Sequence, residues 1–379
     1  MPRRRPLART TVLLTVLGVA ACGEPPGDRL LLTSTYTDEV IALDPADGRV
    51  VRRTAVDPRP TERDEPTGVA VAPDGERWVA VAQGADASAH VFGRDGASER
   101  PAISLGLRAA GRPGVDPEGR RVLVPEYWLG DASPGGAALL TLDDGAVTRL
   151  PPLCAAPHQA AWSPDGRWVA VPCALDDLLL LLDGATLAVR HRVALSPAAA
   201  ARLAAPETTA APDTAAAPGT VVAGAGAGAT GAPLVRPMNV AWAPDSGRLW
   251  VTLLRQGAVA AIDTTGTEIA RAPVPRGPAG IAVTPDGHRL IVPARDDFLV
   301  AVLDAATLET LDRLVVADDP NPHGVVISPD GSTAYVTREG TARSPGGVTA
   351  LRIADGTILW RTEAGAFTLD LRWQRAANR

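Results

Sequence analysis

The stretch TGVAVAPDGERWVAV at residues 67–81 consists of an apolar run, a Pro-Asp-Gly turn and a second apolar run. About five apolar residues on each side suit a β-strand. Proline presets the backbone for the first turn position, and glycine takes the left-handed position that closes a hairpin. Similar stretches recur along the chain, with turn prolines at Pro73, Pro117, Pro164, Pro244, Pro285 and Pro329.

The spacing of these turns predicts the architecture. Successive turn prolines are separated by 44, 47, 80, 41 and 44 residues. A period of forty-odd residues is typical of a propeller blade of four strands, and the step of 80 fits one period plus an insertion of about forty residues. We therefore expect residues 29–379 to form one all-β propeller domain rather than several domains.

The two ends of the chain are expected to share a blade. Residues 28–56 contain three strands, with no Pro-Asp-Gly hairpin before them. Residues 367–373 read as a single strand, and Trp373 lies 44 residues after Pro329, where the next turn is due. The C-terminal strand would then be the innermost strand of the N-terminal blade. This arrangement closes the ring, leaves no free sheet edge and gives seven blades.

The insertion lies at residues 196–235 and is rich in Ala, Pro, Thr and Gly. It has too few large apolar residues to offset its ordering entropy, so a disordered loop is predicted, with a short helix allowed near residues 198–204. A glycine pattern at residues 226–231 has no helix-forming sequence after it, which argues against a dinucleotide site.

The first residues predict export. Residues 1–21 combine basic residues with a short apolar run, which is typical of a signal peptide. Small residues precede Cys22, as in the lipobox of bacterial lipoproteins, so Cys22 is the expected lipidation site and residues 22–28 a tether. The formal net charge is −6 with the leader included, which disfavours nucleic acid as a partner.

The strand after one turn carries a family resemblance. Tyr335-Val336-Thr337 follows Pro329-Asp330-Gly331 and resembles the signature of the YVTN family of seven-bladed propellers, with Arg338 in place of Asn. This family resemblance implies a propeller related to lactonase-like proteins and to the heavy subunit of quinoprotein amine dehydrogenases. Many exported members look like non-catalytic binding or scaffold proteins, and fold alone does not decide between these functions.

Candidate site residues are expected on one face of the ring. Loops that enter the inner strands and loops that leave the second strands meet there, around the channel mouth, where small-ligand sites are common. His158 and His323 occupy the same register in blades three and six, with Arg295 and Asp296 near. They are the catalytic candidates. The alternative is that the histidines are solvated residues without a function, and no metal site or cofactor is predicted.

Other residues on this face are candidates for ligand binding: Glu126, Tyr127, Trp128, Asn239, Arg255 and Arg338. The aromatic pair could stack on a ligand or pack over blades two and three. Two cysteines remain after the predicted lipidation site, Cys154 and Cys173, on either side of one hairpin turn. Export favours a disulfide between them.

Three functions remain open from the sequence. The first is a lipid-anchored, monomeric envelope protein that binds a protein or small ligand without catalysis. The second is a lactonase-like hydrolase with its site at the channel mouth, and the third is a subunit of a periplasmic redox enzyme. No short catalytic motif is present, which lowers the expectation of an enzyme without removing it.

Overall fold

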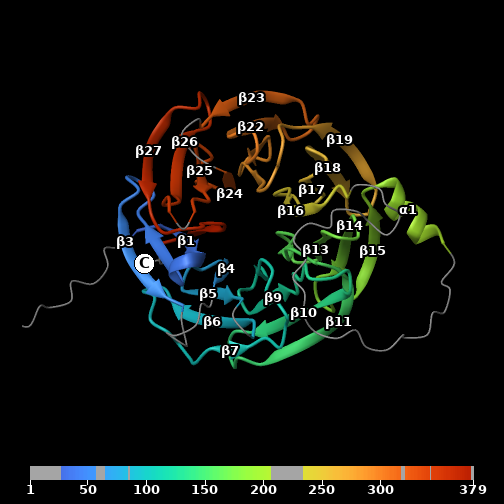
Figure 1. The fold of residues 1–379 in the computed structure, drawn as a ribbon, viewed down its shortest axis with the longest axis horizontal. Coiled ribbons are helices and arrows are strands. Elements are labelled where there is room, and N and C mark those ends of the chain that lie inside the picture. Colours follow the sequence, from blue (N-terminus) through green and yellow to red (C-terminus); the bar gives the residue numbers. More distant parts are fainter. Residues whose placement is uncertain are drawn as a thin grey trace, which may run out of the picture.

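The computed structural model describes residues 27–56, 65–83, 86–205, 234–316, 321–341 and 343–376. Within these ranges the chain forms seven antiparallel sheets of four strands, arranged as a ring around a common centre (Figure 1). The predicted seven-bladed propeller is therefore confirmed. The leader, Cys22 and most of the insertion lie outside the described residues.

Each blade places its strands in order from the channel outward. The closing blade contains β28 (Leu371–Gln374), β1 (Arg29–Ser34), β2 (Glu39–Leu43) and β3 (Val50–Ala55), with a 3-10 helix η1 (Thr35–Thr37) after β1. Blade one contains β4 (Pro66–Val71), β5 (Arg77–Ala82), β6 (Ser88–Gly93) and β7 (Ile103–Ser104). Blade two contains β8 (Gly114–Val115), β9 (Arg121–Pro125), β10 (Pro134–Thr141) and β11 (Val147–Ala155).

The other four blades follow the same order. Blade three contains β12 (Ala161–Trp162), β13 (Trp168–Cys173), β14 (Leu178–Asp183) and β15 (Val189–Ala194). Blade four contains β16 (Pro237–Trp242), β17 (Arg248–Leu253), β18 (Ala258–Asp263) and β19 (Glu268–Pro273). Blade five contains β20 (Ala282–Val283), β21 (Arg289–Ala294), β22 (Leu299–Asp304) and β23 (Thr310–Val315). Blade six contains β24 (Pro322–Ile327), β25 (Thr333–Arg338), β26 (Gly347–Arg352) and β27 (Ile358–Glu363).

The Pro-Asp-Gly turns connect inner to second strands, as predicted. The Asp74 carboxylate accepts a hydrogen bond from the backbone N–H two residues later at 2.9 Å, and Gly75 has a φ of 75°. Blade four has Ser246 in the glycine position, also with a positive φ of 62°. The aspartate thus fixes five of the six turns locally, blade two having Glu118 instead. Where glycine follows, it removes the cost of the left-handed backbone.

The ring closes through the two chain ends. Strand β28 pairs with β1 in antiparallel register, with Leu30 opposite Trp373, and the Thr33 N–H donates to the Asp370 carbonyl at 3.1 Å. Figure 1 places the C-terminus beside β1 and β3. The predicted shared blade is confirmed.

The hydrophobic core lies between neighbouring blades. Strand β14 reads Leu-Leu-Leu-Leu-Leu-Asp, and its five leucines are all buried. Leu179 and Leu181 pack toward blade four, whereas Leu178, Leu180 and Leu182 pack in the cluster shared with blade two. Because successive side chains point to opposite faces, a strand covered on both faces needs a continuous apolar run.

Aromatic residues follow the same rule. Trp78 and Trp250 are fully buried between blades, and Trp162 and Trp242 are also buried. Trp168 and Trp360 are partly buried.

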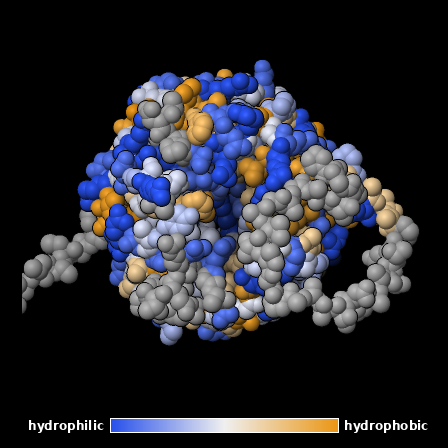
Figure 2. All heavy atoms as spheres, in the orientation of Figure 1, coloured by the Kyte–Doolittle hydropathy of each residue, from blue (hydrophilic) through white to orange (hydrophobic). Residues whose placement is uncertain are grey.

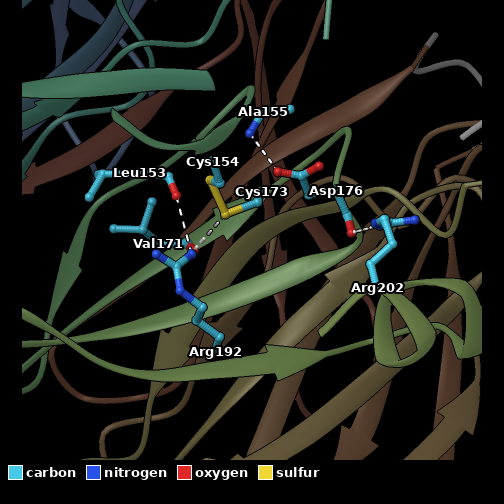
Figure 3. Close-up of a disulfide and its surroundings, with 8 residues drawn as sticks. All are labelled: Leu153, Cys154, Ala155, Val171, Cys173, Asp176, Arg192 and Arg202. Atoms are coloured by element: carbon cyan, nitrogen blue, oxygen red, sulfur yellow. Dashed lines mark hydrogen bonds between the residues drawn. A yellow bond between two sulfur atoms is a disulfide. The ribbon is translucent and has the colours of Figure 1, made fainter. Parts of the chain in front are cut away.

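Blade three has a disulfide and is followed by a short helix. Cys154 and Cys173 form the predicted disulfide, with Cα atoms 6.0 Å apart (Figure 3). The helix α1 (Pro197–Ala204) follows the blade, and the Ser196 hydroxyl caps it by accepting from the Ala199 N–H at 3.2 Å. Ala199 is buried against the blade-three core, so the first ten residues of the insertion are ordered. In the described part of the chain, no helix is long and apolar enough to cross a membrane.

Candidate functional site

A β-bulge in the inner strands shapes the channel. The pairing with the second strand shifts register between Pro66 and Gly68 in blade one, and between Pro237 and Val240 in blade four. Blade six has the same shift. In blades two, three and five, a single isolated bridge precedes the inner strand, and the residues between the bridge and the strand are unpaired with the second strand. Bulges re-aim side chains, so the residues at this point leave the sheet and meet around the channel.

Threonines at the ends of second strands bond the backbone that the bulge frees. The Thr337 hydroxyl accepts from the Gly324 N–H at 2.7 Å, and Thr252 accepts from the Asn239 N–H at 3.1 Å. In the closing blade, Thr33 accepts from the backbone N–H of the equivalent residue. The threonine of the Tyr-Val-Thr signature thus satisfies a donor that would otherwise lack a partner.

One position of the inner strand, five residues before the turn proline, connects adjacent blades. Gln159 accepts from the Val240 N–H at 2.8 Å, and the Asn239 amide donates to the Ala279 carbonyl. Gly324 occupies the same position in blade six, where an added Cβ would lie 2.7 Å from the carbonyl oxygen of the next inner strand. Either a polar side chain reaches the next blade, or the backbones approach too closely for any side chain.

Arg112 occupies this position in blade two, and its side chain crosses the channel instead. Its Nη1 donates to Asn239 Oδ1 at 3.2 Å, and its Nη2 donates to the Leu369 carbonyl at 2.8 Å. Nη1 also lies 3.6 Å from Asp370 Oδ1. The guanidinium therefore joins blade two to blade four and to the closing blade across the ring. Figure 2 shows a hollow at the centre of the ring whose visible residues are mostly hydrophilic.

His323 lies between Arg112 and an acid. Arg112 Nη2 is 2.9 Å from His323 Nδ1, and the Leu369 carbonyl lies 3.1 Å from the same nitrogen. Nδ1 accepts from Arg112 in one tautomer and donates to Leu369 in the other. The second ring nitrogen, Nε2, lies 3.7 Å from Glu339 Oε1. We call Arg112, Asn239, His323, Glu339 and Asp370 the channel cluster.

Burial controls the charges of the channel cluster. Desolvation and the neighbouring Arg112 hold the pKa of His323 well below 6.5. Burial raises the pKa of Glu339, although Arg295 and a hydrogen bond from Asn321 oppose that effect. Burial also lowers the pKa of Arg112, whereas Asp370 raises it. His323 is consequently neutral at physiological pH. Asp370 lies 3.6 Å from Arg112 and 2.7 Å from Arg372.

His158 faces the same channel without joining the cluster. Its Nδ1 donates to the Met238 carbonyl at 2.7 Å, and the Tyr127 ring packs edge-on against it with centroids 4.6 Å apart. Burial, followed by the charge of Arg112, lowers the pKa of His158 to about 3. Both histidines are buried, so neither is the solvated residue that one interpretation of the sequence expected. Among the described residues, no three potential metal ligands converge.

Several predicted ligand-binding residues serve the blades themselves. Glu126 accepts from the backbone and side chain of Arg108, both at 2.9 Å, and these bonds outweigh burial in lowering its pKa. Tyr127 packs over the junction of the blades and accepts from an arginine. Arg108 lies over the Trp128 ring at 5.6 Å. Arg338 is buried and donates to a carbonyl of β27.

The remaining candidates lie in loops of blades four and five. Arg255 is exposed, and Asp296 is exposed beside Arg295. Arg295 Nη2 donates to Glu339 Oε2 at 3.3 Å. The structure therefore brings His323, Arg295 and Glu339 together and leaves His158 apart, held by a different blade.

Neither Arg112 nor Asp370 is among the site residues predicted from the sequence. A signal was present, because both stand at the channel position that other blades fill with Gly, Gln or Asn. The blade-two copy of the repeat is degenerate, however, and the register of the closing blade is visible only once β28 is paired.

These features define a seven-bladed propeller with a buried, arginine-centred channel. Comparison of its fold with solved structures agrees. The periplasmic gluconolactonase PpgL of Pseudomonas aeruginosa is similar with a TM-score of 0.66 and 19% identity, over 93% of this chain and 100% of that one. A protein of unknown function from Desulfotomaculum acetoxidans has a TM-score of 0.66 and 10% identity, over 92% and 99% of the two chains. A provisionally assigned 6-phosphogluconolactonase from Bacteroides fragilis has a TM-score of 0.63 and 14% identity, over 92% and 98%.

Sequence comparison adds less. A family model described as outer membrane protein assembly factor BamB matches residues 215–369. No curated protein matches the sequence significantly. At these identities the solved structures support the fold and leave the activity open.

Proposed function

We propose that this protein is an exported, lipid-anchored propeller that binds a small ligand or a protein at its channel face and does not alter it chemically. The observation that carries this proposal is the internal bonding of the channel cluster. Arg112 bonds Asn239, His323 and the Leu369 carbonyl, and His158 bonds the Met238 carbonyl. Polar side chains that already bond one another rigidify the channel, and they are less able to bond a reacting substrate.

The cell envelope is the proposed location. The signal peptide that the sequence predicts before Cys22 supports it, as do the similarities to a periplasmic protein and to an outer membrane factor. Fractionation of cells that express the full chain tests the anchor. The wild-type protein should enter the detergent phase, and a Cys22→Ser variant should leave it. Light scattering of the detergent-free variant should show a monomer.

Lactone hydrolysis is the second candidate. His323 Nε2 lies 3.7 Å from Glu339 Oε1, and Arg295 bonds the same carboxylate. An acid with a raised pKa beside a cation could move a proton and stabilise a developing oxyanion. The similarity to gluconolactonase-type propellers favours lactones over other esters.

A hydrolysis assay separates the two candidates. The chain without its leader is incubated with γ-, δ- and sugar lactones, with and without divalent metal, and acid release is compared with the spontaneous rate. We expect no enzymatic rate. Turnover that disappears in His323→Ala but persists in His288→Ala, an exposed histidine in a Pro-Asp-Gly turn, would replace the binding proposal with catalysis.

A further inference from the structure

The loops between blades four and five surround a cavity of about 550 Å³ that lies outside the channel cluster. Its volume falls within the range of small-molecule sites. It belongs to the face on which loops enter the inner strands and leave the second strands. The lining residues come from four loops: Leu234, Leu254, Arg255, Gln256, Gly257, Arg276, Gly277, Arg295 and Asp296.

These loops are held in place before any ligand arrives. Arg276 donates from its backbone and its Nε to the Asp297 carboxylate, at 2.7 and 2.8 Å. Gly277 has a φ of 71°, and a Cβ there would lie 2.7 Å from the Asp296 carboxyl carbon. The Arg295 N–H donates to the Gly277 carbonyl at 3.0 Å. Glycine is therefore required for the two loops to meet, and the site is preorganised.

The charges of the lining are not balanced. Three arginines face one aspartate, and two of the three are already engaged. Arg276 pairs with Asp297, and Arg295 pairs with Glu339 at 3.3 Å and with Asp296 at 3.7 Å. No hydrogen bond or ion pair reaches the Arg255 guanidinium from the residues that the structure describes.

A second donor also lacks a hydrogen-bond acceptor. Arg295 Nε is buried and forms no hydrogen bond within the described chain. Buried donors normally have a partner. Asp296 Oδ1 lies 3.7 Å from this Nε, which is beyond hydrogen-bond distance, so the N–H is suited to an incoming acceptor that takes the place of Asp296. One cation without a partner and one unused donor together match a single negative charge. Leu234 and Leu254 supply apolar wall next to them.

We propose that this cavity binds a small organic monoanion, a carboxylate attached to a short carbon skeleton. Arg255 holds the carboxylate, Arg295 Nε donates a hydrogen bond to it, and the carbon skeleton lies against Leu234 and Leu254. A phosphate dianion fits less well, because Arg276 and Arg295 are already neutralised by acids. This inference rests on the proposed binding function and adds the ligand class and its site.

Benzoate is a suitable probe, with benzamide as its neutral analogue of the same shape. Calorimetric titration at low salt should show benzoate binding at least about tenfold more tightly than benzamide, since a hydrogen bond to a charged group is involved. Inorganic phosphate should not displace benzoate. Absent benzoate binding, equal binding of benzamide, or displacement by equimolar phosphate would each overturn the inference.

Matched variants locate the site. Arg255→Gln should weaken benzoate binding at least about tenfold, whereas Asp296→Asn should tighten it because a repelling charge is removed. A merely damaged fold would not tighten binding. Arg289→Gln, which removes an exposed arginine at the start of β21, should leave the affinity unchanged.

The outcomes also separate this site from the proposed function. If neither Arg255→Gln nor Asp296→Asn changed the affinity for benzoate, the cavity would be refuted as the binding site, and the proposed binding function would remain. Lactone turnover lost in His323→Ala, together with benzoate binding that depends on Arg255, would refute the non-catalytic function and keep the site.

Discussion

Replacing Arg112 by methionine tests whether one side chain ties the ring together. Methionine keeps an unbranched apolar stem and removes the guanidinium. Arg112 is only 7% exposed, so water can replace its hydrogen bonds only in part. The backbone bonds of residue 112 to blade three do not change, and the perturbation is therefore confined to the channel.

The expected cost follows from the partners left behind. Asp370 keeps Arg372 at 2.7 Å and the Val69 N–H at 3.0 Å, so no bare buried carboxylate results. Asn239 Oδ1, His323 Nδ1 and the Leu369 carbonyl lose the Arg112 donor, at about 1–3 kcal/mol for each acceptor that stays unsatisfied. His323 Nδ1 and the Leu369 carbonyl are 3.1 Å apart and can bond each other, whereas Asn239 Oδ1 has no such replacement among these groups. Relief of the guanidinium's desolvation offsets part of this loss. We expect the free energy of unfolding to fall by about 2–3 kcal/mol.

Urea denaturation followed by tryptophan fluorescence measures this change, provided that the m-value stays constant. Arg112→Lys should recover less than half of the loss, because an ammonium cannot reach three acceptors in a planar fork. Arg167→Met is the control, since that side chain is 78% exposed and pairs only with an acid in its own turn, and it should cost less than about 0.5 kcal/mol. An Arg112→Met protein as stable as this control would refute the idea that the Arg112 side chain stabilises the ring.

Three further predictions concern the whole ring. Replacing both Cys154 and Cys173 by alanine should lower the free energy of unfolding by about 3 kcal/mol from loop-closure entropy; equal urea midpoints for variant and wild type would contradict it. His158 and His323 have lowered pKa values in the fold, so the unfolded chain binds more protons, and stability should fall as the pH drops below about 6.5, by up to about 1.4 kcal/mol per pH unit and histidine. The raised pKa of Glu339 opposes this trend, and a stability that is flat or rising from pH 7 to pH 5 would show that the histidines titrate normally. A truncation that removes β28 should abolish cooperative unfolding, because two sheet edges open; a soluble truncated protein with a single sharp transition would count against closure by the chain ends.

The pKa values of His158 and His323 also depend on the charges of the channel cluster. His323 faces Arg112, Glu339 and Arg295, and two of these three groups are cations that disfavour a second positive charge. His158 faces Arg112 as well. The Arg112→Met variant should therefore raise both histidine pKa values, although burial, the larger cause, persists. NMR titration of the histidine ring protons would report this effect apart from stability.

Part of this protein could be predicted from its sequence because the determining interactions are local. Proline, aspartate and glycine at each turn restrict the backbone by sterics, and their spacing of forty-odd residues counts the blades. The disulfide follows from two cysteines on either side of one turn. The closing strand follows from the single apolar stretch at residues 367–373, although Trp373 lies inside β28 opposite Leu30 and not at the predicted turn position.

The channel cluster could be recognised only in the tertiary structure. Arg112 lies 211 residues from His323 along the chain, and they meet because the ring curvature and the inner-strand bulges aim both side chains at one axis. The local sequence pattern does not show the direction in which these side chains point. The pattern also could not show that His158 and His323 are buried and neutral, because their charge depends on desolvation by blades that are distant in sequence.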